Sequence, residues 1–299
     1  MTSKRRRKRP AARGSSTQAS AREPSKPATP GALAASPFPG LGVTLGRGLG
    51  VVGSSPAVLV TAFVGLLATW TTFVLLGVEA APQFLAVAMA ISPANLFTDV
   101  PVAFAEGGTA TVLVTIGGLA ILRAVTFALL IALIGDGLEG RPGLRAAVRR
   151  LPRAGMTLMA VYLVEVGVVV ILLQLVAGFL GQLSLLVVAA AIYFLAFVPV
   201  VAVVDGEGLQ AAFRRGVRAA RLPGTRHLTL VFLYFLFLFY AASISPFGPL
   251  PPATPTVPIW ILGLAMTFLH CGVLGGLVYR WLAVRDQVPA VKAAARTAP

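Results

Sequence analysis

The stretch TATVLVTIGGLAILRAVTFALLIALI, residues Thr109–Ile134, runs directly into GDGLEGRPGLRAAVRRLPR, residues Gly135–Arg153. The first part carries one charged residue, Arg123, and exceeds the roughly 20 residues that a helix needs to cross a bilayer core. The second part carries five arginines. Because basic residues are retained on the cytoplasmic side during insertion, this order predicts a transmembrane helix that ends at the cytoplasmic surface.

The composition of the whole chain is typical of a membrane protein. Of its 299 residues, 57% are hydrophobic and 12% are charged, whereas soluble domains carry about 25% charged residues. The net charge of +15 is divided among a tail and short loops and does not form one basic face, so nucleic-acid binding is not indicated. Arginine outnumbers lysine 21 to 4, as in GC-rich prokaryotic genomes. The single cysteine, Cys271, excludes an intramolecular disulfide.

Hydropathy predicts six transmembrane segments. Of the 25 lysines and arginines, 24 lie on one side of them: ten before the first segment, then five, five and four in two loops and the C-terminal end. The three opposite loops contain no basic residue. We therefore expect a multi-pass protein of the plasma membrane with both termini in the cytoplasm. The segments are Pro56–Val78, Thr109–Ile134, Gly155–Phe179, Leu183–Val204, His227–Ser245 and Ile259–Ala283.

The expected fold class is all-α, with three parts along the chain. Residues 1–40 are expected to be a disordered basic cytoplasmic tail, residues 41–287 a six-helix transmembrane domain, and residues 288–299 a cytoplasmic C-terminal tail. The basic run Lys4–Arg9 indicates either binding to anionic lipid headgroups or, more simply, a solvated tail that keeps the N-terminus inside. Trp260 and Trp281 bracket the last segment, as interfacial aromatic residues do.

A motif recurs on the basic side of the predicted membrane. Leu144-Arg-Ala-Ala-Val-Arg-Arg150 matches Leu209-Gln-Ala-Ala-Phe-Arg-Arg215, and each copy follows an acidic turn that contains glycine. Apolar residues take one helical face and arginines the other, which predicts short amphipathic helices at the inner surface. A fainter copy, Leu41–Val52, precedes the first segment, although its glycines weaken a helix. The chain would then hold a threefold internal repeat; alternatively, arginine-rich inner loops produce such patterns in any multi-span protein.

The stretch Phe197-Val-Pro-Val-Val-Ala-Val-Val-Asp-Gly-Glu-Gly208 leads into Leu209-Gln-Ala-Ala-Phe-Arg-Arg-Gly-Val-Arg218. In this C-terminal half the chain resembles a set of prokaryotic six-span proteins. The set includes the membrane domain found beside some glycerophosphodiester phosphodiesterase domains. The resemblance implies a membrane domain without an activity of its own.

Arg123 and Glu165 lie deep within the second and third predicted segments. At 1.5 Å per residue, they lie about 18 Å and about 15 Å from the inner end. The two segments are antiparallel, so we expect the charges to meet, with Thr126 and Tyr162 completing a candidate polar cluster. Either this is a buried ion pair that fixes the helix register, which we favour, or it is a substrate or proton site.

His270 and Cys271 are weaker candidates near the middle of the last segment. Adjacent residues on a helix point about 100° apart, so they form no natural pair of metal ligands. A cysteine–histidine nucleophile also needs a third, orienting group, for which the sequence offers no candidate. His270 is expected to be a core histidine that is hydrogen-bonded across helices. We therefore expect no metal, no cofactor and no catalytic residue.

Two functions remain open at this level. The favoured one is a non-enzymatic integral membrane protein that organises, or assembles with, other envelope components. Its partners would be the lipid bilayer, anionic headgroups at the inner surface and other membrane proteins. The alternative is a small-molecule or lipid transporter that uses the polar site near Arg123 and Glu165. A membrane-embedded enzyme is least supported, since such enzymes need several polar residues at one depth.

Overall fold

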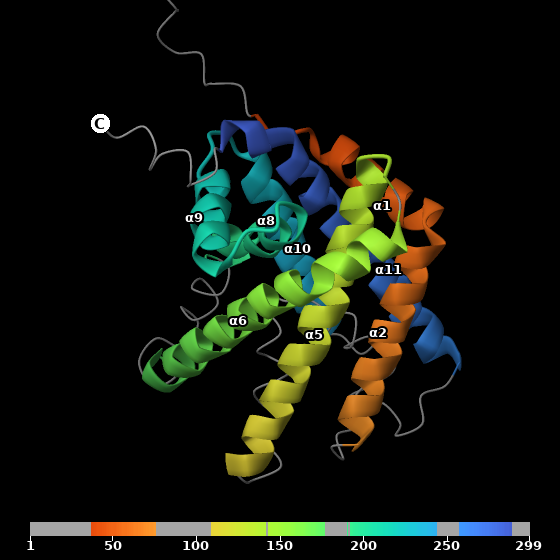
Figure 1. Ribbon diagram of the computed structural model, residues 1–299, viewed down its shortest axis with the longest axis vertical. Helices are drawn as coiled ribbons and strands as arrows, with labels where there is room; N and C mark the ends of the chain where they lie inside the picture. Colours follow the sequence, from red (N-terminus) through yellow and green to blue (C-terminus); the bar gives the residue numbers. More distant parts are fainter. Residues whose placement is uncertain are drawn as a thin grey trace, which may run out of the picture. The chain divides into compact units, whose positions relative to one another are not determined.

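The computed structural model describes residues 37–75, 109–141, 143–176, 190, 192–243 and 257–288. The chain divides into two units, Met1–Leu33 and Ala34–Pro299, and all of these residues belong to the second. Within them all regular secondary structure is helical, which confirms the all-α fold class (Figure 1). The two predicted tails lie outside this part of the chain except at their inner ends, where Phe38 and Val288 are buried.

Helices occupy the described portions of five of the six predicted segments, and in the fourth, Leu183–Val204, a turn at Ala196–Phe197 interrupts the predicted continuous helix before α8. Helix α2 begins at the predicted Pro56, α10 begins one residue before the predicted His227, and α11 ends one residue after the predicted Ala283. The fourth segment ends, as predicted, at Val204. The helices are α1 (Leu41–Ser54), α2 (Pro56–Leu75), α5 (Thr109–Leu138), α6 (Leu144–Val176), α8 (Val198–Val204), α9 (Leu209–Ala220), α10 (Arg226–Ser243), α11 (Val257–Val284) and a 3-10 turn, Arg285–Gln287.

Two of these helical stretches are long and apolar enough to cross a membrane, Gly117–Leu138 and Trp260–Gln287. A third candidate is the pair α1 and α2, if the two helices, which meet at Ser55 with a bend of 87°, count as one span. The length and apolar character of these helices support a membrane protein. Exposed apolar side chains follow two of these helices: Leu59, Val60, Phe63, Val64 and Leu67 on α2, and Ile261, Leu264 and Leu269 on α11.

Helix α1 forms despite its glycines, and one of them explains why. Gly48 faces α11 so closely that a Cβ atom placed on it would lie 2.1 Å from the Gly272 carbonyl oxygen and 2.5 Å from the Gly276 nitrogen. The glycines therefore lower the intrinsic helix propensity of α1 but allow its backbone to touch that of α11. Thr44 and Val52, one turn before and after Gly48, are buried in the same contact face.

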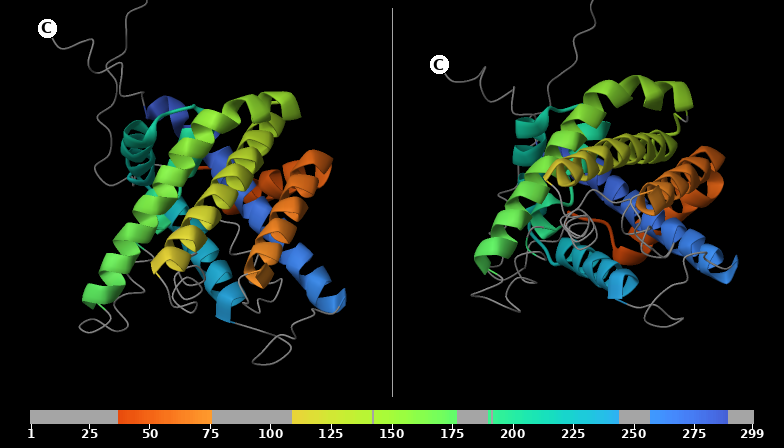
Figure 2. Two further views of the ribbon diagram at one scale, coloured as in Figure 1. Left: turned by 60° about the horizontal axis from the view of Figure 1, so that its bottom comes forward. Right: turned by 90° about the horizontal axis from the view of Figure 1, so that it is seen from below.

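Helix α6 differs from the prediction. We expected a separate interfacial helix around Leu144–Arg150, followed by a span from Gly155. One helix instead runs through Pro152 and visibly curves (Figure 2). A proline inside a helix loses one hydrogen bond and costs about 3 kcal/mol, but it bends a helix without always ending it. Burial of Ala147 and Ala154 on either side of the proline, along a helix that packs on α5, offsets this cost.

Candidate functional site

Polar side chains gather where the arginine-rich loops of the chain meet the helix ends. Four arginines there join segments that are far apart in sequence. We call these arginines and their partners the arginine network. Its ion pairs are Arg150–Asp136, Arg215–Asp205, Arg215–Glu207 and Arg285–Glu139, and its fourth arginine, Arg280, binds carbonyl and hydroxyl oxygens.

Arg215 in α9 has the fullest set of partners. Its Nη1 atom donates to Asp205 Oδ2 at 2.6 Å and to Glu207 Oε1 at 3.2 Å. Its Nε and Nη2 atoms donate to the Val288 carbonyl oxygen at 3.2 and 3.1 Å. Its guanidinium carbon lies 5.0 Å from the Trp281 ring centroid. Arg215 therefore fastens α9, the acidic turn before it and the end of the C-terminal helix together.

The sequence indicated that Trp281 is an interfacial aromatic residue. In the structure it is instead part of the arginine network. It is fully buried, and its Nε1 atom donates to Asp205 Oδ1 at 3.4 Å. The hydropathy pattern shows that Trp281 lies near the end of an apolar segment, but it cannot predict that the ring contacts a residue of another segment. Trp260, at the opposite end of α11, packs edge-on against Trp70 of α2, with ring centroids 5.4 Å apart.

Arg280 is completely buried, although its position in the charge count suggested a loop residue. Its Nε atom donates to the Thr44 hydroxyl at 3.0 Å, and its Nη2 atom donates to the Pro39 carbonyl at 3.3 Å. Its Nη1 atom donates to the Arg226 carbonyl. The guanidinium also lies over the Phe38 ring, 5.8 Å from its centroid. Arg280 thus joins α11 to α1, to the start of α10 and to the segment before α1.

The two matched loops place one arginine each in the same role. Arg150 and Arg215 are the last residues of the matching heptapeptides, and each pairs with the aspartate that begins the preceding acidic turn, Asp136 at 2.9 Å and Asp205 at 2.6 Å. The prediction that the arginines of these helices all lie on the polar face, opposite the apolar residues, is therefore wrong for Arg150 and Arg215. They share a buried face with alanines, since Ala147, Ala154, Ala212 and Ala219 are all buried.

The predicted intramembrane cluster is assembled in part. Arg123 is buried, and its guanidinium carbon lies 5.7 Å from the centroid of the Tyr162 ring, so α5 and α6 meet here as expected. Thr126 is also buried, but its methyl group packs against Gly65 of α2, where a Cβ atom would come within 2.4 Å of it. The Glu165 side chain lies outside the described residues, so its pairing with Arg123 stays a prediction.

His270 and Cys271 are both fully buried in α11. The His270 ring lies between two aromatic rings, with centroids 5.6 Å from Tyr234 and 6.4 Å from Phe127. This surrounding is that of a core histidine. In the described ranges, no group of three or more histidine, cysteine, aspartate or glutamate residues is placed to hold a metal ion.

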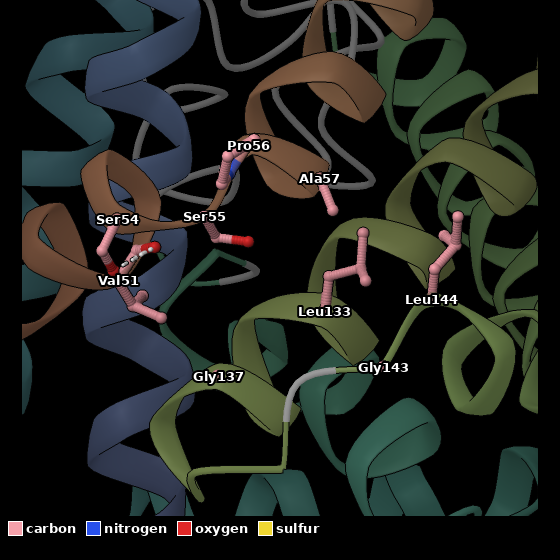
Figure 3. Close-up of a pocket in the computed structure, with 9 residues that line it drawn as sticks. All are labelled: Val51, Ser54, Ser55, Pro56, Ala57, Leu133, Gly137, Gly143 and Leu144. Atoms are coloured by element: carbon pink, nitrogen blue, oxygen red, sulfur yellow. Dashed lines mark hydrogen bonds between the residues drawn. The ribbon is translucent and has the colours of Figure 1, made fainter.

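Two hollows lie beside α2. The first, of about 520 Å³, lies between α2 and α11 and has a mostly apolar lining that includes Cys271. The second, of about 400 Å³, lies in the bend between α1 and α2, and we call it the elbow groove. In Figure 3 the Ser55 hydroxyl, Ala57 and Leu133 point into it. Its lining residues are Val51, Ser54, Ser55, Pro56, Ala57, Leu133, Gly137, Gly143 and Leu144.

Comparisons of the chain with protein-family models, with curated proteins and with solved structures found no match. The resemblance to six-span prokaryotic membrane proteins therefore stays a prediction, and the candidate site rests on the geometry of this chain alone.

Sequence reasoning missed the burial of Arg280 and the contact at Gly48. A signal existed for each. Arg280 falls inside the last predicted segment, Ile259–Ala283, where a charge is costly unless it has partners. Gly272 and Gly276 lie four residues apart on α11, and Gly48 lies among the glycines of α1. Small residues at this spacing are typical of helices that cross closely.

Proposed function

We propose that this protein is a six-span integral membrane protein of the prokaryotic plasma membrane, with both termini in the cytoplasm. In this proposal it catalyses no reaction and organises, or assembles with, other envelope components. Anionic lipid headgroups at the inner surface are among its partners. The charge segregation of the sequence supports the orientation, because the ion-paired arginines of the network and the exposed arginines of α6 and α9 all lie on the predicted inner side.

Two features support a threefold repeat. The Asp136–Arg150 and Asp205–Arg215 pairs are equivalent in the second and third copies. Gly48 of α1 and Gly216 of α9 each lie seven residues after the first leucine of their copy, and each approaches the backbone of a neighbouring helix. That neighbour is α8, directly before α9 in the chain, for Gly216, and α11, far along the chain from α1, for Gly48. In the first copy, the corresponding Arg47 is exposed and has no ion pair with another described residue.

One observation carries the assignment of a structural role. In the arginine network, buried charge is used to join helices. Arg215 and Arg280 direct their donors at protein oxygens on other segments, and Asp136 is buried against Arg150. Charges held in this way favour a fixed helix arrangement and leave few donors for a substrate. An assembly factor needs such a rigid frame, whereas a transporter has to change its shape around a bound molecule.

The topology is tested by cysteine accessibility in a Cys271→Ala background. Arg149→Cys and Arg214→Cys, both at exposed positions of predicted inner helices, are expected to react with a membrane-impermeant thiol reagent only after the membrane is opened. Gly181→Cys, in a predicted outer loop, is expected to react in intact cells. Labelling of Arg214→Cys in intact cells would contradict the orientation.

Assembly is tested by photo-crosslinking in native membranes. A crosslinking amino acid at Gln210 or Arg214 on the exposed face of α9 is expected to give a discrete protein adduct. The same probe at Ala212, which is buried, is the matched control and is expected to give none. If no exposed position on any of the helices yields an adduct, the assembly function is wrong.

A transporter remains the second candidate, because Arg123 is buried within a candidate span. The sole cysteine tests this reading without engineering. Cys271 is 0% exposed, and the hollow that it lines is mostly apolar, so a water-soluble thiol reagent is expected to leave it unlabelled in intact membranes. Rapid labelling that a transported solute blocks would show a hydrated cavity and would favour the transporter.

The predicted ion pair is tested by a charge swap. Arg123→Ala and Glu165→Ala are each expected to lower the yield of folded protein, because removing one partner of a buried pair costs roughly 3–5 kcal/mol. Arg123→Glu combined with Glu165→Arg is expected to recover part of that yield, measured by size-exclusion chromatography of the solubilised protein. If the double variant is as poor as the worse single variant, the two side chains do not pair.

A further inference from the structure

The elbow groove has two chemically different walls. Ala57 of α2, Leu133 of α5 and Leu144 of α6 give it an apolar side, while the Ser54 and Ser55 hydroxyls lie at the bend of the chain (Figure 3). Ser54 donates its hydroxyl to the Val51 carbonyl at 3.3 Å, whereas Ser55 Oγ has no hydrogen-bond partner among the described residues. An opening of this kind at the end of a span fits a molecule that is apolar at one end and polar at the other.

A stripe of positive charge begins in the sequence one residue after Leu144. Leu144 lines the groove, and Arg145, Arg149 and Arg153 follow it at intervals of four residues, so that they share one face of α6. All three are exposed, and none has an ion-pair partner in the described part of the chain. This distinguishes them from Arg141 and Arg150 of the same loop, which pair with Glu139 and Asp136.

Exposed apolar residues run parallel to the arginine stripe. Leu144 is 54% exposed, Val148 is 47% exposed and Met156 is 70% exposed, all on the N-terminal half of α6. Beside a line of unpaired arginines, this pattern is that of a helix at the interface between acyl chains and headgroups. The acids nearest in sequence are already neutralised, since Arg150 pairs with Asp136, and Arg141 and Arg285 both pair with Glu139.

We propose that the elbow groove is a binding site for one anionic glycerophospholipid of the inner leaflet. An acyl chain lies against the wall formed by Ala57, Leu133 and Leu144, and the phosphate and headgroup lie toward Ser55, Arg145 and Arg149. The proposal rests on the inner orientation of these loops given above. It adds to that orientation a single defined site with a preference for negative charge, where the sequence indicates only a diffuse basic surface.

The site is tested by native mass spectrometry of the full-length protein in detergent with equal amounts of phosphatidylglycerol and phosphatidylcholine. Wild-type protein is expected to retain one phosphatidylglycerol in preference to phosphatidylcholine. Ala57→Phe, which fills the groove, is expected to abolish that retention. Val64→Phe is its control, because Val64 is exposed on the same helix and lines neither hollow.

The repeat supplies a control for charge. Arg145→Gln with Arg149→Gln is expected to weaken phosphatidylglycerol retention by about fivefold for each arginine, the effect of one basic residue near an anionic surface. Arg214→Gln with Arg218→Gln removes the same charge from exposed positions of α9, away from the groove residues, and is expected to leave retention unchanged.

Three results would overturn the site. They are equal retention of the two lipids, equal losses from the two arginine pairs, and full retention by Ala57→Phe. The arginine variants are surface changes, so they give a result even if Ala57→Phe fails to fold. Because the orientation is measured separately with Arg149→Cys and Arg214→Cys, a lost lipid preference with an intact topology removes this site and leaves the proposed function standing.

Discussion

Replacing Gly48 with alanine is expected to destabilise the protein by an amount near the upper end of the 1–3 kcal/mol range for overpacked sites. The added Cβ atom would meet the Gly272 oxygen at 2.1 Å and the Gly276 nitrogen at 2.5 Å. Both are backbone atoms of α11, which cannot rotate away as a side chain can. The helices must therefore separate, and the Arg280–Thr44 hydrogen bond beside them must lengthen or break.

The same helix provides a control of opposite sign. A Cβ atom on Gly46 meets nothing within 4 Å, so Gly46→Ala gains helix propensity without a clash and is expected to stabilise α1 by up to about 1 kcal/mol. Gly272→Ala should fall between the two, because its nearest contact is the flexible end of the Leu49 side chain.

The buried thiol of Cys271, next to Gly272 on α11, supplies the measurement. A thiol-reactive dye that becomes fluorescent on reaction reports the temperature at which the helices open. Gly48→Ala should lower that temperature and Gly46→Ala should raise it or leave it unchanged. If both substitutions shift the opening temperature equally, the glycines of α1 affect its helix propensity and not its packing against α11.

The positions of the helices were largely predictable from the sequence, and their contacts were not. Hydropathy places the start of α2 at the predicted residue, and the start of α10 and the end of α11 within one residue, because it depends only on where apolar runs begin and end; α5 runs four residues beyond the predicted Ile134. It cannot tell whether a helix of mixed composition stops at a proline, and α6 does not stop at Pro152. That outcome depends on burial against α5, a tertiary contact that no local window contains.

The pairs of adjacent arginines also show that tertiary contacts are not predictable from the local sequence. Arg149 and Arg150 are adjacent, as are Arg214 and Arg215, and in each pair only the second meets an aspartate. The choice follows helical phase, because Arg150 lies three residues after Ala147 and four before Ala154, on the face of small residues that packs inward. The alanines were visible in the sequence, but an arginine is ordinarily assigned to the polar face, so the inward position of Arg150 and Arg215 was missed.

Because Arg214 and Arg215 lie on different faces of α9, substitutions at the two positions are expected to differ strongly in their effect on stability. Arg215→Met is expected to cost roughly 3–5 kcal/mol, the usual result of breaking a buried ion pair from one side. It would leave the Asp205 carboxylate without its cation and the Val288 carbonyl without its two donors. Arg214→Met, one residue earlier on the exposed face, is expected to change stability by at most about 0.5 kcal/mol.

The equivalent pair in the second copy makes this a test of the repeat as well as of one side chain. If the two loops are structurally equivalent, Arg150→Met should destabilise more than Arg149→Met, again measured by the melting temperature at Cys271. The loss should be smaller than at Arg215, because the Arg150 side chain is 39% exposed and makes one ion pair, whereas that of Arg215 is 8% exposed and holds four hydrogen bonds. If Arg149→Met and Arg150→Met destabilise the protein equally, the matched sequences do not form matched structures. The sequence repeat would then reflect only the arginine-rich composition that the predicted inner loops share.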